Sequence, residues 1–560
     1  MPHAQRPCLW LSFALAAAVL TAISAAAGAK ESSVSVKEAE EYIAKGDLKA
    51  AEIELKNAIR QSPQDPILRA RLAQVYLQLG DAGLAEREAR AARERNGDEA
   101  DYLPVLAEAL LQQQKFADIP DQIQPGDRPP ALESKVRTAL GAAGAGLGDR
   151  EKAEAMWRDA IRLDPPAAKP KVQLARFLTK TNPNEADKLI DEAIAANPRS
   201  AEFLQVKGDM AQLRGDPTGA VRLFDEALKI DPKNLLAHLS RANVNIMLGN
   251  FPAADGDLDP ILKAMPNHFM ANYLRAVELA KKHQYADADR ILERISPAFP
   301  KGGGGYYIQG ATKLALGQLA QAESILGKYL ARVPDDQSAA RLMASAALQQ
   351  RAANRAIDYL KPHVEKPTVD AATLSMLGNA YMAAGKPELA LQQFEKAAVL
   401  DPENPSIKAS VAISEMNTGQ AREGLAQLEQ VFASEGGAAI AGPTLVLSEL
   451  RAKRVAKAAE VAASLIKLDA ANPLYQTLLG VVDVAQRDYA GAESAFRAAL
   501  ARNSLSTKVG PAIAAPPSLS NTRSSWARPS RAWPVFISEI ATPALMDGFS
   551  GSRAAAFSNC

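Results

Sequence analysis

The sequence predicts an all-α solenoid built from about 14 helix-turn-helix units, because two residue types recur at one fixed interval. Proline recurs every 34 residues at Pro198, Pro232, Pro266, Pro300 and Pro334. Alanine keeps the same interval at Ala220, Ala254, Ala288, Ala322, Ala356 and Ala390. A fixed period of this length is typical of stacked repeats and not of separate globular domains.

The unit at residues 371–404 shows how each period predicts two helices. Small and apolar residues follow helical spacing in two successive segments: Leu377, Gly378 and Tyr381, then Ala390, Phe394 and Ala397. Gly385 permits a tight turn between the segments. Asp401-Pro402 ends the second helix, because proline lacks an amide donor and disfavours helical dihedrals in the residue before it. We expect Gly378 to let the two helices approach closely, with Phe394 beside it.

A 34-residue helix-turn-helix period resembles the tetratricopeptide repeat (TPR). This resemblance implies a right-handed TPR superhelical solenoid over residues 30–503. The expected units lie near residues 32–65, 66–99, 100–133, 134–166, 167–200, 201–234, 235–268, 269–302, 303–336, 337–370, 371–404, 405–438, 439–472 and 473–503. The third unit is broken up by five prolines, of which Pro104 is the first, and we expect its second helix to be short or irregular.

Both ends of the chain depart from the repeat. Residues 1–29 combine an early arginine, an apolar stretch and the small residues Ala27-Gly28-Ala29, which is the pattern of a secretory signal peptide. Cleavage is expected after Ala29, and an uncleaved N-terminal anchor is the alternative. Residues 504–560 lose the period and become rich in serine, proline and arginine. This tail is expected to be disordered or to be translated out of frame.

Composition excludes several function classes. Lys+Arg total 65 and Asp+Glu total 64, so whole-chain charge does not favour nucleic acid as a partner. Cys8 and Cys560 lie at the two ends of the chain, outside the repeats, so the repeats contain no thiolate site. The five histidines have no metal-ligand spacing, and no nucleophile motif is present. The glycine run at residues 302–305 lacks the lysine of a phosphate loop and is expected to form a flexible turn between repeats. We therefore expect no enzyme activity, no cofactor and no metal.

The candidate binding surface is a groove. In TPR proteins, positions 2, 5, 9 and 12 of each unit face a concave groove lined by the first helices. The resemblance therefore implies groove roles for Leu236, Leu239, Asn243, Met270, Tyr273, Tyr307 and Asn379. Aromatic and aliphatic groups beside asparagine would suit an extended apolar segment whose backbone needs hydrogen-bond partners. Packing against neighbouring helices is the alternative role for the same side chains.

A signal sequence followed by a long array with A-N-P and L-D-P-x-N boundaries resembles the PrsT type of PEP-CTERM/exosortase-associated TPR proteins. The resemblance implies an exported, periplasmic or envelope-associated scaffold of a Gram-negative bacterium. Its partners would be envelope proteins, extended peptide segments or exopolysaccharide machinery. Two alternatives stay open: the periplasmic TPR portion of a cellulose-export-like secretion machine, and a TPR array that precedes a catalytic domain missing from this chain.

Overall fold

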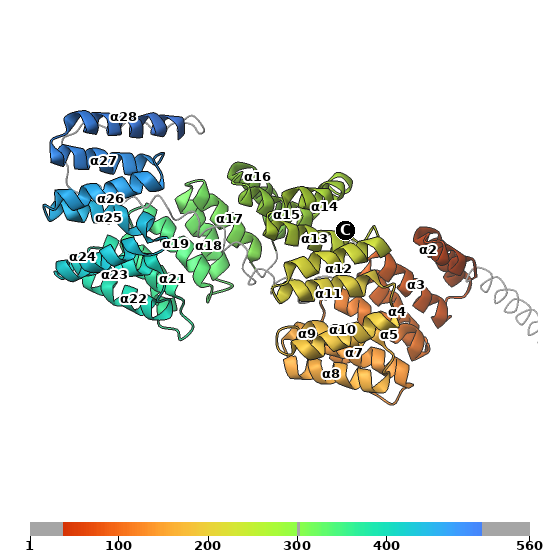
Figure 1. Cartoon of the computed structure of the whole chain (residues 1–560). Helices are drawn as coiled ribbons and strands as arrows, with labels where there is room; N and C mark the ends of the chain where they lie inside the picture. Colours follow the sequence, from red (N-terminus) through yellow and green to blue (C-terminus); the bar gives the residue numbers. More distant parts are fainter. Residues whose placement is uncertain (1–36, 300–302, 507–560) are drawn as a thin grey trace, which may run out of the picture. The chain divides into compact units, whose positions relative to one another are not determined.

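The computed structural model describes residues 37–299 and 303–506, with side chains placed as far as residue 501. The expected signal peptide and the tail beyond residue 506 lie outside the described residues. Every regular element within them is helical, and a helix over residues 37–44 begins the array (Figure 1). The further α-helices are α2 (Leu48–Gln61), α3 (Pro66–Leu79), α4 (Ala82–Glu94), α5 (Glu99–Gln112), α6 (Asp118–Gln122), α7 (Pro130–Leu147), α8 (Arg150–Leu163), α9 (Ala168–Leu178), α10 (Pro183–Ala196), α11 (Ala201–Leu213), α12 (Pro217–Ile230), α13 (Leu235–Leu248), α14 (Phe251–Ala264), α15 (Phe269–Lys281), α16 (Tyr285–Ile295), α17 (Gly304–Ala315), α18 (Leu319–Leu330), α19 (Gln337–Gln349), α20 (Ala353–Val364), α21 (Ala371–Ala383), α22 (Pro387–Leu400), α23 (Pro405–Asn417), α24 (Ala421–Ala433), α25 (Gly437–Arg451), α26 (Val455–Leu468), α27 (Pro473–Gln486) and α28 (Tyr489–Ser506).

The pair α21–α22 confirms the packing expected from the sequence. Gly378 lies against the ring of Phe394, and a Cβ at residue 378 would come within 2.6 Å of that ring. Phe394 is almost fully buried. Gly385 adopts a left-handed φ of 71° in the turn, and α22 ends at Leu400, directly before Asp401-Pro402. A glycine on the first helix therefore creates the space that an aromatic ring on the second helix fills.

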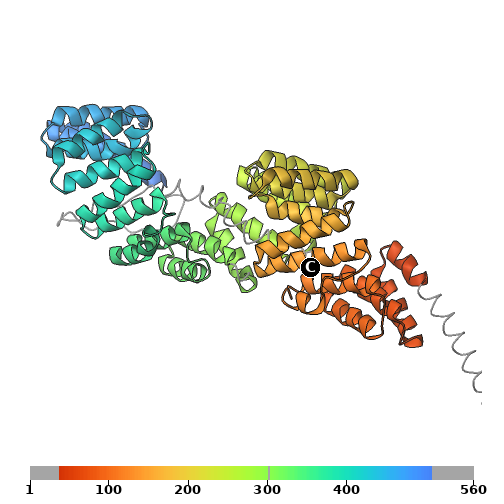
Figure 2. The same ribbon diagram turned by 90° about the horizontal axis from the view of Figure 1, so that it is seen from below.

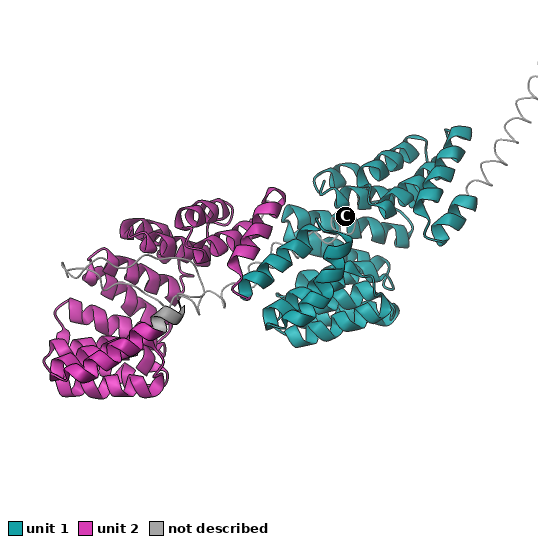
Figure 3. Ribbon diagram, turned by 90° about the horizontal axis from the view of Figure 1, so that it is seen from above, with its two compact units in different colours: residues 1–281, 541–560 teal, residues 282–540 magenta. Residues whose placement is uncertain are grey.

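The described residues form two compact units, one ending at Lys281 and one beginning at Lys282 (Figure 3). Each unit is a stack of helix pairs, and Figure 2 shows this stacking from a second direction. Buried alanines make up much of both cores. Because alanine is small, the helices of a pair can pack closely together.

The third repeat has the short second helix that its prolines predict, since α6 contains only five residues. Pro104 does not interrupt the first helix of this repeat, because α5 runs through this residue. Pro104 is the sixth residue of the helix, close to its N-terminal end, and its side chain is half-buried.

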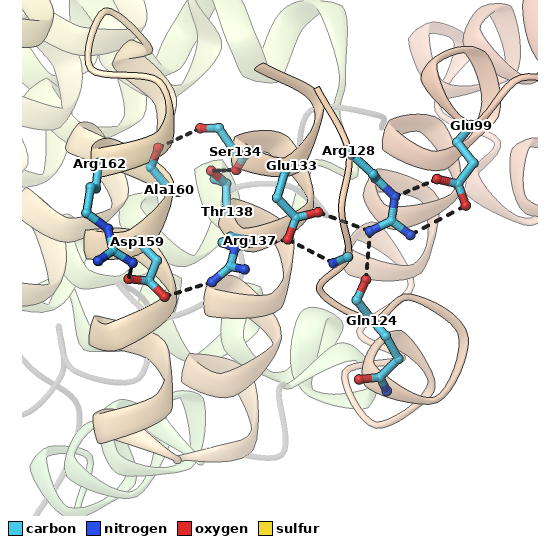
Figure 4. Close-up of polar contacts among 11 residues, drawn as sticks. Glu99, Gln124, Arg128, Glu133, Ser134, Arg137, Thr138, Asp159, Ala160 and Arg162 are labelled. Carbon is cyan, nitrogen blue, oxygen red and sulfur yellow. Dashed lines mark hydrogen bonds and ion pairs between the residues drawn. The ribbon is translucent and has the colours of Figure 1, made fainter. Parts of the chain in front are cut away.

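In the third repeat, where the second helix α6 is short, a row of alternating acidic and basic side chains connects the neighbouring segments (Figure 4). We call this row, from Glu99 to Asp159, the charge ladder. Arg128, from the segment after α6, binds Glu99 at 2.5 Å and Glu133 at 3.0 Å. Glu133 also accepts from Arg137, whose guanidinium continues to Asp159 of α8 at 2.7 Å. Glu133 is 2% exposed, so its charge depends on these arginines for compensation. The ladder fixes the irregular segment to its neighbours on both sides.

Three further details refine the predicted boundaries. The two units at 405–438 and 439–472, which match the repeat pattern less well, form complete pairs α23–α24 and α25–α26. The last helix continues to Ser506, three residues past the expected end of the array at 503. Gly304 and Gly305 do not lie in the expected flexible turn, because they form the first residues of α17.

Among the described helices, none has both the length and the apolar character required to cross a membrane.

Candidate functional site

The first helices of successive repeats lie side by side within each compact unit. In the first unit α9 contacts α11, α11 contacts α13, and α13 contacts α15. Each second helix packs between the first helix of its own repeat and that of the next, as α12 does with α11 and α13. The first helices of the first unit therefore form one continuous side of that unit, and the predicted groove residues of this unit belong to α13 and α15.

The five groove residues of the first unit differ in how far they are accessible. Leu239 and Tyr273 are each 5% exposed. Leu236, Asn243 and Met270 are half-buried. The half-buried side chains can contact a bound segment directly. Leu239 and Tyr273 are buried and chiefly pack beneath the accessible side chains.

Tyr273 is packed within α15. Its ring stacks on Phe269 at a centroid distance of 6.4 Å and an interplanar angle of 15°. Burial raises the pKa of the Tyr273 hydroxyl, so the phenol stays neutral at physiological pH. Truncation of this ring would remove packing as well as any contact to a partner. Leu236 and Met270 are therefore better positions at which to test binding.

The remaining predicted residues, Tyr307 and Asn379, belong to the second compact unit. Tyr307 on α17 is 4% exposed and meets Tyr329 of α18 edge-on, with ring centroids 5.5 Å apart. The Tyr329 hydroxyl donates to Asp336 at 2.6 Å, and Asp336 caps the start of α19. Asn379 on α21 is exposed. Tyr307 thus supports the packing of its repeat, whereas Asn379 is available at the surface.

The structure adds a polar cluster on α11 and α13 that positions 2, 5, 9 and 12 identify only in part. Asp209, at position 9 of its repeat, accepts hydrogen bonds from Gln205 and from the Ser240 hydroxyl, the latter at 3.0 Å. Burial raises the pKa of Asp209 to about 6, although the nearby charge of Arg176 and the two hydrogen bonds act in the opposite direction. Gln205 occupies position 5, so the same rule finds it. Ser240 occupies position 6 and escapes the rule.

Two histidines outside this cluster make hydrogen bonds that stabilise the helices. His238 Nδ1 donates to the Asp257 carboxylate at 2.6 Å, and this contact raises the pKa of His238. His268 Nδ1 accepts from the amide of Ala271 at the start of α15. Within residues 37–299 and 303–506, no group of three or more His, Cys, Asp or Glu side chains is arranged to hold a metal ion.

Comparison with family models agrees with the repeated helix pairs. Three family models described as tetratricopeptide repeat match residues 42–109, residues 371–404, and residues 176–234 together with 309–367. A similar solved structure is the crystal structure of the APC/C hetero-tetramer Cut9–Hcn1, at 15% identity and a TM-score of 0.47. That alignment covers 79% of this chain and 95% of the other. A search of curated proteins found no match.

Proposed function

We propose that this chain, whose repeats match the tetratricopeptide repeat, is an exported non-catalytic scaffold. It binds other proteins through its first helices. Tetratricopeptide repeats themselves indicate protein–protein interaction. The further proposal is a role in envelope assembly, in PEP-CTERM/exosortase sorting linked to exopolysaccharide production. The N-terminal pattern of residues 1–29 supports export, and the repeat boundaries support the PrsT resemblance.

The observation that carries the binding proposal is the mixed surface of α13 and α15. Leu236 and Met270 leave apolar area partly accessible, and Asn243 adds an amide that can hydrogen-bond to a peptide backbone. Apolar side chains beside a hydrogen-bonding amide suit an extended segment, whose side chains need pockets and whose backbone needs polar partners. This combination favours a protein or peptide ligand.

Affinity capture from a native envelope extract tests the proposal. The bait is the full chain, compared with a Leu236→Glu/Met270→Glu variant that places two charges on the first-helix side. Ile230→Glu, at an exposed apolar residue of the second helix α12, is the matched control. We expect an exported envelope protein that the original and control chains retain and the double variant loses. Equal capture by all three chains would contradict the groove.

Export is tested separately. We expect cell fractionation to place the chain in the periplasm or envelope, and N-terminal sequencing of that fraction to begin at Lys30. A chain recovered only from the cytoplasm would contradict export and leave the binding surface untouched. A chain in the envelope that begins at Met1 or Pro2 would support the uncleaved anchor.

A further inference from the structure

The first helices α23, α25 and α27 of the second compact unit carry a row of equivalent residues that is almost wholly apolar. α23 contacts α25, and α25 contacts α27. On each helix, four residues spaced i, i+3, i+7 and i+10 recur at an interval of 34 residues, so they face the same side of the unit. They are Ser406, Ala409, Ile413 and Met416 on α23, Ile440, Pro443, Leu447 and Leu450 on α25, and Leu474, Thr477, Val481 and Val484 on α27. We call these residues the apolar stripe.

The apolar stripe is accessible, because the second helices do not cover it. Ile440, Leu474 and Val484 are 37%, 44% and 46% exposed. Within the stripe, Ala409 alone is buried, and the remaining side chains are half-buried or exposed. Ten residues of helix rise about 15 Å, and three packed helices span about 20 Å. The stripe is therefore large enough to contact several side chains of a ligand at once.

The stripe contains no charged side chain and no amide, which distinguishes it from the corresponding side of α11 in the first unit. The equivalent residues on α11 are Glu202, Gln205, Asp209 and Gln212. In the stripe only Ser406 and Thr477 are polar, and the Thr477 hydroxyl already donates to the Pro473 carbonyl at 2.8 Å. A charge placed against such a surface loses water without gaining a partner. The side of a ligand that faces the stripe must therefore be apolar and uncharged.

The same lack of polar side chains selects the conformation of the ligand. An extended segment has backbone N–H and C=O groups without internal partners, and covering them with an apolar surface costs free energy. An α-helix pairs these groups internally and contacts its surroundings through side chains. A helix that lies across α23, α25 and α27 needs a length of about 20 Å, or about 13 residues. The stripe therefore suits a helix, whereas Asn243 beside Leu236 and Met270 suits an extended segment.

We propose that the apolar stripe binds one amphipathic α-helix of a partner protein. Apolar side chains of that helix, at i, i+3 or i+4, and i+7, contact α23, α25 and α27, and its polar side remains in water. This inference goes beyond the proposed groove on α13 and α15, because it concerns another unit and a ligand of another conformation. The stripe can bind a helix even where the first unit binds nothing.

The test selects helical peptides of about 16 residues from a phage-displayed library, against the full chain and its Leu474→Glu/Val484→Glu variant. Val399→Glu/Leu468→Glu is the matched control, because it places two charges on exposed apolar residues of the second helices α22 and α26. We expect the original and control chains to enrich peptides with apolar residues at i, i+3 or i+4, and i+7. The Leu474→Glu/Val484→Glu chain should not enrich them. Enrichment of no helical peptide on any chain would overturn the proposal.

The Leu236→Glu/Met270→Glu chain separates the stripe from the groove of the first unit. We expect this chain to enrich the same peptides as the original chain. Loss of enrichment here, with unchanged enrichment on Leu474→Glu/Val484→Glu, would overturn the stripe and assign the peptides to α13 and α15. Hydrogen exchange of the original chain, with and without one enriched peptide, needs no variant and should show added protection in α25 and α27. Added protection in other helices alone would overturn the stripe.

Anisotropy measurements test whether the ligand binds as a helix. They compare one enriched peptide with a version in which a central, solvent-facing residue is replaced by proline. We expect the proline version to bind about a hundredfold more weakly, because proline disrupts the helix and leaves its apolar side chains in place. Equal binding of the two peptides would overturn the helical ligand.

Sedimentation of the original chain alone tests a second copy as the occupant of the stripe. We expect a monomer. A dimer that the Leu474→Glu/Val484→Glu substitutions abolish would overturn the partner helix and assign the stripe to self-association.

Discussion

Successive repeats are connected by ion pairs and hydrogen bonds in residues 66–336, but by apolar packing in residues 337–472. The joint position, defined here as the twenty-first residue of each repeat, lies on the second helix. In the earlier region it is mostly acidic, namely Glu86, Glu154, Asp187, Asp255, Asp289 and Glu323, with Pro120 and Val221 as exceptions. In the later region it is apolar, namely Ile357, Leu391, Leu425 and Ala459.

The acidic joints bind the following repeat. Glu86 accepts from Gln113 and Lys115, at 2.8 and 2.7 Å. Asp187 accepts from Arg214 at 2.6 Å, and Asp289 accepts from Lys313 at 2.8 Å. Five of these six carboxylates bind the next repeat directly, while Glu154 binds Arg158 of its own helix, and Arg158 in turn binds Glu185.

The apolar joints pack instead of pairing. Ile357 belongs to a buried cluster with Leu377 and Ala380 of the next repeat. Leu425 packs on a cluster that contains Ala441 and Leu445 of the next repeat. The comparison teaches that one helix arrangement accepts either chemistry at the same position. It also predicts that the two regions respond differently to substitution, acid and salt.

Glu323→Ala should have the largest effect. It leaves Gln350, Arg355 and the Tyr359 hydroxyl without their shared acceptor, and Glu323 is buried. The Arg355 side chain that remains is 48% exposed, so the main loss is that of three hydrogen bonds to one buried carboxylate, which costs about 4 kcal/mol. Hydrogen exchange should show lost protection in α19 and α20, with α25–α26 as the internal reference. Unchanged protection in α19 and α20 would mean that the ionic joint contributes nothing to stability.

The second largest effect should be a loss of stability of residues 66–336 at low pH. Burial alone would raise the pKa of Glu86, but hydrogen bonds from Lys115, Arg90 and Gln113 outweigh burial and lower the pKa from its usual 4.5 to about 2. A carboxylate with a lowered folded-state pKa stabilises the fold above pH 4.5, and this contribution disappears as the pH falls toward 2. The loss is on the order of 3 kcal/mol.

Urea unfolding of the original chain and of Glu86→Gln at about pH 5 and about pH 2.5, on either side of the usual carboxyl pKa, measures this loss. The variant should show the smaller drop, because the residue that titrates has been removed. Glu493→Gln is the control, since the exposed Glu493 pairs with Arg497 of its own helix. Equal drops in all three chains would contradict the role of Glu86.

Ile357→Ala should cost about 2 kcal/mol, because it removes buried apolar volume from an apolar joint. The cost should be the same at low salt and at about 1 M NaCl, whereas the cost of Glu323→Ala should fall at high salt. Urea unfolding at both salt concentrations gives the comparison. A salt-dependent cost for Ile357→Ala would remove the proposed distinction between the two regions.

The smallest effect concerns the exception at Val221. A Val221→Glu/Leu248→Arg double variant builds an ionic joint where the earlier region has an apolar one, by analogy with the pair of Asp187 and Arg214. Leu248 is 50% exposed, so the new pair should contribute only about 0.5 kcal/mol. A double-mutant cycle in urea measures this coupling. A coupling of zero at low salt would show that the joint needs burial as well as charge.

The fold was predictable because it depends on local spacing. The contact of Gly378 with Phe394, the turn at Gly385 and the end of α22 all follow from residues within one 34-residue unit. The helical conformation at Pro104 was not predictable, because proline lacks the amide donor that a helix interior uses. The candidate site was predictable only in outline. Position rules found Asp209, but its bond to Ser240, 31 residues further along the chain, depends on how two helices pack together.

The charge ladder in the third repeat has a consequence for the modularity of the chain. A repeat array can gain or lose whole units, since each unit contacts only its neighbours. The ladder from Glu99 through Arg128 and Glu133 to Asp159 crosses two successive repeat boundaries. Excision of residues 100–133 would remove Arg128 and Glu133, so Glu99 and Arg137 would each lose a partner, while Arg137 would keep Asp159. The ladder therefore connects residues 66–166 across both repeat boundaries, and removal of the third repeat alone would cost the array this connection.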